Sequence, residues 1–349
     1  MTVYIGVDFH ARCQTIVWMD DANGEIHQVE LDHRKDDVRG FYQQMPPGTI
    51  VGFECSGYTA WFEELLEELG HEIWAGDPAE IRRRARRRQK NDRRDAALVL
   101  DLLVKREFPR VHRRTGESSD VLRQLRHRHR MVKMRTMISN GLQAVAIGSG
   151  MHKKVRVNSR AGRSAIERMQ LRPVFDQQRK SLLGLLDELT QRISVVERWL
   201  EDQASGDDRV ARLQTHPGFG LLTSLALVHV LEPVERFSTS RKVAAYLGLD
   251  PMENSSADKK RYGSISKAGA KVVRFLLGEA GQSAAKNDPD LRRFYQRLAI
   301  KRNRSIAKVA VARKLAVRGF TMLRDQIDYE EFLRRGVQQR RSNSKASSR

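Results

Sequence analysis

The segment VYIGVDF, residues 3–9, is a β-branched run that carries one carboxylate, Asp8, in an otherwise apolar setting. An uncompensated charge at such a position is costly, so Asp8 needs a partner. Two further runs follow, QTIVWMD at 14–20 and IHQVEL at 26–31, and DDANGE at 20–25 supplies turn chemistry between them. The three runs predict an antiparallel β-meander.

Helices and strands alternate after this meander. A helix is predicted over 36–44, and Pro-Pro-Gly at 46–48 breaks the chain before TIVGFEC at 49–55, which is typical of a buried strand. A helix at 58–70 ends on a glycine, and HEIWAGD at 71–77 gives one more strand. This is the element order of an RNase H-like fold, although other α/β folds share pieces of it.

From residue 92 the pattern becomes helical, with helices predicted over 92–107 and about 118–145. A third helix carries a seam of apolar residues at alternating spacings of four and three. Paired with the preceding helix as a hairpin, or with another chain, this seam would form a stalk suited to dimerisation, and an ordinary bundle helix is the alternative. The seam residues are Leu182, Leu186, Leu189, Ile193, Val196 and Leu200.

Charge is distributed unevenly along the chain. The formal net charge is +21, which favours a polyanionic partner, yet residues 1–80 hold four basic and sixteen acidic side chains. The sharpest basic run, RRRARRRQKNDRR at 82–94, places nine Arg or Lys in thirteen positions. Such like charges repel unless phosphates neutralise them, although a solvated helix face is the alternative. The nucleic-acid contacts expected here are Arg82, Arg83, Arg84, Arg86, Arg87, Arg88 and Lys90.

Composition excludes several classes of protein. With 40% hydrophobic residues the chain can form a core, and its length suggests two or three domains. Two cysteines without CxxC spacing exclude a disulfide framework and a cysteine-based zinc site. The longest apolar stretch has 11 residues, too few to span a bilayer, and the N-terminus shows no secretory pattern. We therefore expect a cytoplasmic protein with no membrane partner, ending in a disordered basic arm at 334–349.

Four carboxylates stand where they can converge: Asp8, Glu54, Asp92 and Asp95. In an RNase H-like sheet the centre of the first strand lies beside the end of a later strand, and Asp92 and Asp95 share one face of the following helix. Such a cluster repels itself without cations, and oxygen ligands suit Mg²⁺ or Mn²⁺. Two such ions activate a nucleophile and stabilise a leaving oxygen in phosphodiester chemistry. The alternative for each acid singly is a surface charge or a cap; Asp92 would then be the N-cap of its helix.

Two segments in the C-terminal half are candidates for phosphate chemistry. THPGFG at 215–220 is similar to a helix-hairpin-helix, in which the amides of Gly218 and Gly220 would approach a phosphate, and a simple tight turn is the alternative. Further on, a polar loop holds Ser255 and Ser256, and a helix is predicted to begin near Lys267. A serine can attack a phosphodiester, and nearby cations would stabilise the developing charge; a flexible loop is the alternative. These cations are Lys259, Lys260, Arg261 and Lys267.

Together these motifs resemble the DEDD-type transposases of bacterial insertion sequences, the insertion-sequence one-ten family, which are related to the Piv-type site-specific invertases. The resemblance covers about residues 3–325. Its markers, in the order of the family, are YIGVD at 4–8, GFECSGY at 52–58, QKNDRRDA at 89–96, PGFG at 217–220, YLGLDP at 246–251, SISKAG at 264–269 and KVAVARKL at 308–315.

The resemblance implies four parts of the chain. Residues 1–108 would form a RuvC-like α/β domain of the RNase H-like class with a DEDD metal site, and 109–205 a coiled-coil-like helical stalk for oligomerisation. Residues 206–330 would form a mainly α transposase domain that carries the nucleophile, and 331–349 a disordered basic tail. The family pattern places that nucleophile five residues after the proline of its GLxP turn, at Ser256, with Ser255 as a near alternative.

The resemblance also implies a mechanism. Ser256 would attack DNA to form a covalent phosphoserine intermediate, and the acidic metal site of a partner subunit would complete the active centre in a dimer or tetramer. A noncoding RNA from the flank of the element would bridge donor and target DNA by base pairing. We therefore expect a bacterial recombinase that associates with the nucleoid during activity. The alternatives are a RuvC-like junction endonuclease, an invertase that reads DNA directly, and a non-enzymatic packaging protein.

Overall fold

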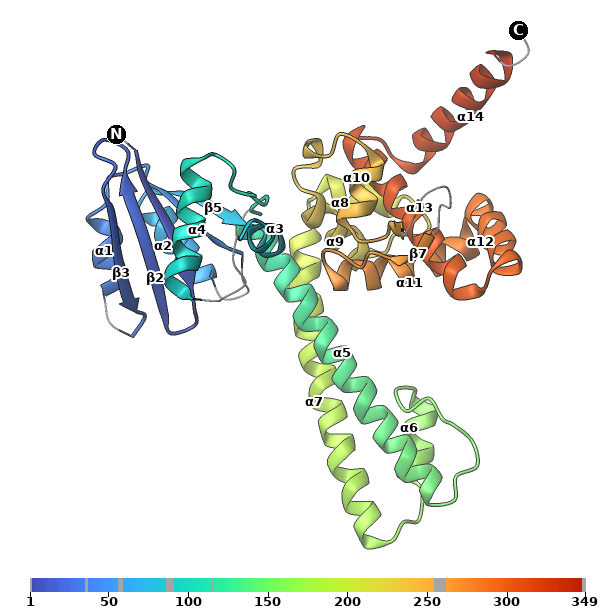
Figure 1. Ribbon diagram of the computed structural model, residues 1–349. Coiled ribbons are helices and arrows are strands. Elements are labelled where there is room, and N and C mark those ends of the chain that lie inside the picture. Colours follow the sequence, from blue (N-terminus) through green and yellow to red (C-terminus); the bar gives the residue numbers. More distant parts are fainter. Residues whose placement is uncertain are drawn as a thin grey trace. The chain divides into compact units, whose positions relative to one another are not determined.

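The computed structural model describes residues 2–34, 37–55, 59–85, 91–114, 116–253 and 262–346. The chain divides into two compact units, Met1–Arg113 and Arg114–Arg349, which are described in turn (Figure 1). The expected stalk and C-terminal domain therefore lie within one unit. No helix in the described ranges combines the length and apolarity needed to cross a membrane.

The first unit is built on a five-stranded mixed sheet in the order β3-β2-β1-β4-β5. Strands β1 (Val3–Phe9), β2 (Cys13–Asp20) and β3 (Ile26–Asp32) form the predicted antiparallel meander. Strands β4 (Ile50–Glu54) and β5 (Glu72–Gly76) extend the sheet in parallel on the other side of β1. The α/β prediction for this part of the chain is thus confirmed.

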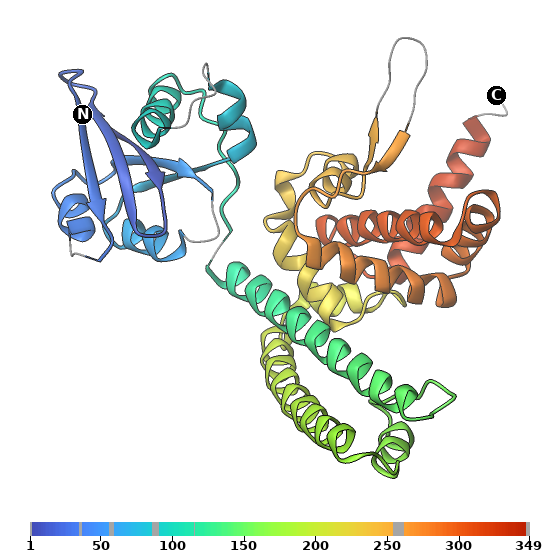
Figure 2. The same ribbon diagram turned by 60° about the horizontal axis from the view of Figure 1, so that its bottom comes forward.

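Helices cover both faces of this sheet (Figures 1 and 2). Helices α1 (Asp37–Gln43) and α2 (Ala60–Glu68) pack on the face formed by Ile5 and Val7, where the main core of the unit lies. The helix α3 (Pro78–Arg84) follows β5, and α4 (Asp92–Val104) packs against the opposite face. Because side chains alternate along a strand, Asp8 belongs to the face that α4 covers.

A glycine in β1 allows α4 to lie directly on the sheet. A Cβ atom at Gly6 would come within 2.4 Å of the Ala96 carbonyl oxygen and 2.5 Å of the Leu100 nitrogen. Contacts this short do not occur, so any side chain at residue 6 would push α4 away. The helix was predicted to continue to residue 107, but it ends at Val104, because Arg106 adopts a left-handed backbone with a φ of 57°.

The second unit begins with the helical hairpin that the seam predicted. Helices α5 (Gly116–Gly148) and α7 (Pro173–Ala204) pair along their length, and the short α6 (Arg160–Glu167) lies at their far end (Figure 1). The seam residues alternate between buried and half-buried positions: Leu186, Ile193 and Leu200 are buried, and Leu182, Leu189 and Val196 are half-buried. Much of the seam is therefore used within the chain.

A helical core completes the second unit. It contains α8 (Asp208–Gln214), α9 (Leu221–Leu231), a 3₁₀ turn (Val234–Arg236), α10 (Ser240–Tyr246), α11 (Lys271–Asn287), α12 (Pro289–Lys301), α13 (Arg304–Arg324) and α14 (Tyr329–Ala346). The central helices are α9, α11 and α13, whose apolar residues form the largest hydrophobic cluster. The expectation of a mainly α domain is confirmed for the described residues.

Three predictions for this unit are corrected. Two strands, β6 (Pro251–Glu253) and β7 (Tyr262–Ile265), pair where only a loop was expected (Figure 2). The next helix starts at Lys271 and not near Lys267, because Lys267 and Gly269 have positive φ angles of 56° and 67°. The tail, expected to be disordered from residue 331, is helical as far as Ala346, since Tyr329 and Phe332 pack against the core and start α14.

A buried polar network ties the turn after α8 to three other helices. The Nε2 atom of His216 lies 3.2 Å from the Nη1 atom of Arg318, which donates to the Oδ2 atom of Asp288 at 2.6 Å. Asp288 is also the N-cap of α12, accepting from the Leu291 amide, and it accepts a hydrogen bond from the Tyr329 hydroxyl. Burial and, to a smaller extent, the Arg318 charge lower the pKa of His216 to about 4, while the Asp288 charge opposes the change. The folded unit therefore holds this imidazole neutral.

We predict that this network makes the second unit less stable in mild acid. An unfolded histidine titrates near 6.5, so between pH 6.5 and 4 the unfolded chain binds more protons than the folded chain. The free energy of unfolding should fall by about 2 kcal/mol between pH 6.5 and 4.5 because of His216. Urea unfolding of the full chain, followed by far-UV circular dichroism, should show a shallower pH dependence for His216→Gln. The control is His152→Gln at an exposed position; equal slopes for His216→Gln and the unsubstituted protein would contradict the prediction.

Candidate active site

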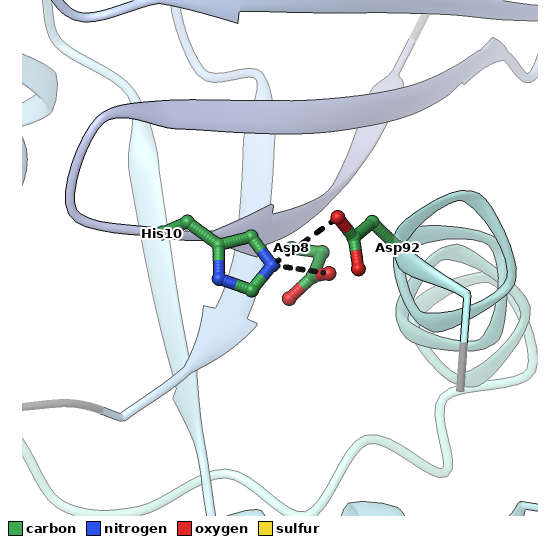
Figure 3. A group of neighbouring side chains, drawn as sticks. All are labelled: Asp8, His10 and Asp92. Atoms are coloured by element: carbon green, nitrogen blue, oxygen red, sulfur yellow. Dashed lines mark hydrogen bonds and ion pairs between the residues drawn. The ribbon is translucent and has the colours of Figure 1, made fainter.

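Three side chains with metal-ligating atoms meet at the edge between β1 and α4: Asp8, His10 and Asp92 (Figure 3). The Nε2 atom of His10 lies 3.1 Å from the Oδ2 atom of Asp8 and 3.6 Å from the Oδ2 atom of Asp92. One ligand atom from each residue lies within 4.8 Å of the other two. Asp8 is half-buried, whereas His10 and Asp92 are exposed to solvent. Two of the three side chains are therefore accessible from solvent.

The local structure explains why these residues meet. Asp8 is on the strand that α4 packs against, and His10 follows at the start of the turn into β2, where its amide donates to the Cys13 carbonyl. The N-cap of α4 is Asn91, whose side chain accepts from the Arg93 amide, so the alternative in which Asp92 is the cap is wrong. Asp92 instead occupies the first turn, where the helix dipole favours a carboxylate.

The electrostatics of the cluster fit a bound cation. Burial raises the pKa of the Asp8 carboxyl above its ordinary value, the His10 ring opposes the rise, and the carboxylates of Asp92 and Asp95 add to it. The charged form of Asp8 is thus disfavoured chiefly by burial, and the neighbouring acids add to this effect. A divalent cation would remove this repulsion and replace lost solvation, because carboxylate oxygens are the ligands that Mg²⁺ and Mn²⁺ prefer.

The other two predicted acids lie outside this three-residue group. Residue pairing in the sheet sets Val7 opposite Phe53, so Glu54, the last residue of β4, follows beside Asp8 in the neighbouring strand. One carboxylate oxygen of Glu54 is buried and makes no hydrogen bond; it forms an ion pair with Arg82 at 3.4 Å. Among the described residues, the structure thus brings Asp8 and Asp92 within ligand distance and leaves Glu54 next to them.

Asp92 and Asp95 line different hollows beside the first turn of α4. Asp92 lines a polar hollow of about 410 Å³ together with Glu30 of β3. Asp95, which is half-buried, lines another of about 650 Å³ together with Arg84. The two acids were expected to share one helix face, and both do act on the charge of Asp8. Their immediate surroundings nevertheless differ.

His10 was not among the sequence-predicted site residues. The signal that could have found it is the Asp-x-His spacing, because residues two apart in a strand point to the same side. An imidazole is a ligand for Mn²⁺ and later first-row metals, and Mg²⁺ seldom takes one. The group therefore contains one nitrogen and two carboxylate donors, where oxygen donors alone were expected.

The basic run is only partly described. Arg82, Arg83 and Arg84 are exposed in the last turn of α3, and besides the Arg82–Glu54 pair, Arg83 pairs with Glu80 at 2.8 Å. The predicted contacts Arg86, Arg87, Arg88 and Lys90 lie outside the described residues.

The glycine turn between α8 and α9 does not present both glycines to a ligand. Gly218 is buried, and its amide donates to the Nδ1 atom of His216 at 3.0 Å. A Cβ atom at Gly218 would come within 2.5 Å of the Ala284 side chain, so close packing on α11 requires the glycine. The prediction that Gly218 binds a phosphate is therefore wrong. Gly220 is exposed at the N-cap of α9 and remains a predicted contact.

The candidate nucleophile lies outside the described residues. Ser255 and Ser256, with the neighbouring cations Lys259, Lys260 and Arg261, belong to the connection between β6 and β7. Of the cations predicted near the serine, the structure describes Lys267, which is exposed just after β7.

Comparison with known proteins gives two family matches. A model described as "Transposase IS116/IS110/IS902 family" matches residues 210–296, and a DEDD-type transposase model for IS110, the one-ten insertion sequence, matches residues 5–146. The latter match covers the five-stranded sheet and agrees with the RNase H-like prediction. A DEDD domain implies a divalent metal, which the Asp8, His10 and Asp92 group suits.

Similar proteins come from several bacteria. A probable family 20 transposase of Pseudomonas aeruginosa is 28% identical over 326 residues, spanning 89% of this chain and 94% of its own length. The transposase for insertion sequence element IS1111A of Coxiella burnetii is 26% identical, spanning 81% of this chain and 79% of its own. The transposase for insertion sequence element IS1328 of Yersinia enterocolitica is 25% identical, spanning 78% and 81%.

We predict that His10 is a ligand to Mn²⁺ bound at this cluster. Electron spin-echo spectra of the full chain with Mn²⁺ should show coupling to an imidazole nitrogen, and His10→Ala should remove it. The affinity for Mn²⁺ should also fall on the order of tenfold, which corresponds to about 1.4 kcal/mol. The matched control is His27→Ala, which removes an imidazole of β3 lying beside Glu25. A nitrogen coupling that survives in His10→Ala would contradict the prediction.

Proposed function

Because the chain belongs to the IS116/IS110/IS902 family of transposases, we propose that it excises and inserts its mobile element through a covalent bond between Ser256 and DNA, guided by a noncoding RNA. A transposase cleaves and rejoins DNA, so the chain is an enzyme that acts on DNA strands. The finer points, namely the serine linkage, the RNA guide and the assembly of several copies, form the proposal.

The observation that carries the proposal is the pair of family matches on the two parts that such chemistry needs. One match covers β1 and α4, which carry Asp8 and Asp92, and the other covers the hairpin β6–β7 that connects through the serine loop. An acid cluster alone would suit many nucleases. An acid cluster and a serine loop in the order of this family favour a recombinase.

We propose that Asp8 and Asp92 hold a divalent ion, Mg²⁺ or Mn²⁺, with Glu54 and Asp95 completing the set of four acids. Bound there, the ion supplies positive charge to the oxygens around the phosphorus under attack. The protein's own part is to fix the carboxylates. The strand β1 holds Asp8 rigidly, the Asn91 cap starts α4 at Asp92, and Arg82 neutralises Glu54.

The proposed covalent step balances as a transesterification. The Oγ atom of Ser256 forms a bond to phosphorus, and the bond from phosphorus to one deoxyribose oxygen breaks. The serine proton leaves to solvent or a base, and the departing sugar oxygen takes up a proton. Because one phosphodiester replaces another, the reverse attack by a new DNA hydroxyl rejoins strands without an added energy source.

The alternative enzyme is a metal-dependent junction endonuclease, in which Ser256 is only structural. The acid cluster at Asp8 and Asp92 favours it, because such a cluster activates water as readily as a serine. The two functions differ in one product, a protein–DNA adduct that survives denaturation.

We predict that the protein, incubated with element-end DNA, RNA from the element's flank and Mn²⁺, gives this adduct. Ser256→Ala should abolish it, and omission of the RNA should reduce it at least tenfold. The matched control is Ser255→Ala, which leaves the proposed nucleophile in place and should retain the adduct. Denaturing gels with labelled DNA give the measurement. Cleavage without any adduct would establish the endonuclease, and an adduct that does not depend on the RNA would establish an invertase that reads DNA directly.

We propose that the active form contains two or four copies of the chain, joined through the stalk. An apolar groove of about 860 Å³ runs between α5 and α7, and its side chains Met134, Met137, Leu185 and Val195 are all exposed. Apolar patches of this kind usually mark interfaces. The charged side chains at the groove, Glu188 and Arg192, pair with each other at 2.7 Å, so the groove presents little net charge to repel a second copy.

We predict that Leu185→Asp disrupts this assembly without unfolding the hairpin, because Leu185 lines the groove and is 46% exposed. Light scattering of the full chain should show the mass falling to that of one copy. The control is Val174→Asp, which places the same charge at an exposed position in the first turn of α7, outside the groove. A mass unchanged by Leu185→Asp would show that the groove does not join copies.

A further inference from the structure

Helix α5 has an unusual charge pattern. Between Asp120 and Glu167 the sequence contains no acidic residue, while α5 carries six Lys or Arg side chains over 123–135. Cations on a surface helix ordinarily gain support from acids three or four residues away, and beyond Asp120, three residues before Arg123, this helix offers none along that stretch. Their charge has to be balanced by another element or by a ligand.

One side of α5 is balanced by α7. The guanidinium of Arg128 donates to the Glu197 carboxylate through Nε at 2.8 Å and Nη2 at 2.5 Å. This is a two-pronged ion pair between half-buried side chains, and it fixes the pairing of the two stalk helices. Arg128 is thus used within the fold.

The other side of α5 is not balanced. Arg126, His129, Arg130 and Lys133 follow one another at spacings of three, one and three, which places them on one face of the helix. Within the described part of the chain, no ion pair is formed by Arg126, Arg130 or Lys133. Partial burial lowers the pKa of the Arg126 guanidinium, and repulsion from the cations Arg114, Arg123 and Arg130 lowers it further.

Helix α11 adds a cation and an aromatic ring to this face. The rings of His129 and Phe275 lie 4.5 Å apart between their centroids, and Lys271 is one helical turn before Phe275. Burial lowers the pKa of His129, and so do the charges of Lys133, Arg128 and Lys271. The charges that act on this imidazole are therefore all positive.

Phe275 is exposed, whereas the apolar residues on the other side of its helix face the core. Val272, Val273, Leu276 and Leu277 are buried in the unit's main core, whereas Phe275 is 45% exposed. A single exposed apolar residue is unremarkable by itself. Here the exposed ring lies against His129 and one helical turn from Lys271, and the cations of this face form no ion pair among the residues that the structure describes. That combination suits an aromatic ligand that carries negative charge.

Single-stranded nucleic acid has this chemistry. Its bases stack on exposed aromatic rings, and its phosphates attract cations spaced along a groove or face. A duplex keeps its bases stacked inside and would use the cations alone. We propose that Arg126, Arg130, Lys133, Lys271 and Phe275, with His129 supporting the ring, bind a single-stranded nucleic-acid segment; we refer to these residues as the α5–α11 face.

The proposed binding of a single strand extends the proposed recombinase function. It rests on that function only for where the bound strand comes from. The chain from β7 to α11 is short, and Arg274 fixes it by donating to the carbonyls of Ala268 and Gly269. A short segment fixed by these hydrogen bonds therefore joins the α5–α11 face to β7, the strand that follows the Ser256 segment in the sequence. A strand held there is either DNA opened for attack or an unpaired part of the guide RNA.

The test uses the full chain and labelled twelve-nucleotide oligomers in three forms: single-stranded RNA, single-stranded DNA and duplex DNA. Fluorescence anisotropy gives the affinity over a series of salt concentrations. Phe275→Ala should weaken single-strand binding on the order of tenfold and leave duplex binding and the salt slope unchanged. Arg126→Gln with Arg130→Gln should reduce the slope of log affinity against log salt by about 1.4 for single strands.

Two matched controls keep the result specific. Ile300→Ala removes an apolar side chain that is 88% exposed on α12, and Arg293→Gln removes an exposed guanidinium paired with Asp290. Neither control should change binding. Tighter binding of RNA or of DNA, with the stated losses in the variants, supports the face and identifies the source of the strand. Variants that bind like the controls, or a Phe275→Ala variant that loses duplex binding equally, would overturn it.

The outcome is separable from that of the proposed function. If the variants lose single-strand affinity as predicted but no serine adduct forms, the α5–α11 face is supported and the recombinase mechanism fails. If the adduct forms and the variants bind single strands as tightly as the unsubstituted protein, the mechanism stands and the proposed binding face is wrong. Circular dichroism of each variant checks that the fold is retained.

Discussion

The candidate site depends on a missing side chain in the central strand of the sheet. With no Cβ atom at Gly6, the backbone of α4 contacts β1 directly, and the first turn of that helix comes level with Asp8. Strand pairing fixes the backbone of Asp8 and the Asn91 cap fixes the backbone of Asp92, so the fold sets the two acids side by side despite their repulsion. Packing thus holds together charges that would separate in solution, which is what a cation site requires.

The two units carry local excess charge of opposite sign. In the first unit, acids lie close together at a site that would bind a cation. In the second unit, Arg128 of α5 is neutralised on the side of α7 by Glu197, and the cations on the side of α11 form no ion pair with any residue that the structure describes. The neutralised side stabilises the hairpin. The other side supplies the electrostatic attraction that a chain acting on nucleic acid needs.

The sequence predicted the parts of the molecule that depend on local pattern. Alternation of apolar residues predicted the meander of β1 to β3, and the spacing of Leu186, Ile193 and Leu200 predicted α7.

The features that the sequence did not predict depend on long-range contacts. Gly218 looked like a phosphate-binding glycine, but its role is set by Ala284, which is distant in sequence, and by a hydrogen bond to His216. His10 was not predicted because its ring comes beside Asp8 and Asp92 only in the folded chain. Composition marked the tail as disordered, yet Tyr329 and Phe332 anchor its first turn.

An imidazole 3.1 Å from a carboxylate oxygen also bears on which metal ion the cluster would select. Mixed nitrogen and oxygen donors bind the later first-row ions more tightly than magnesium, and zinc lies near the top of that order. With Asp8, His10 and Asp92 as its protein donors, zinc would keep a fourth position for water or substrate, so the one imidazole would widen the range of ions that the cluster can hold.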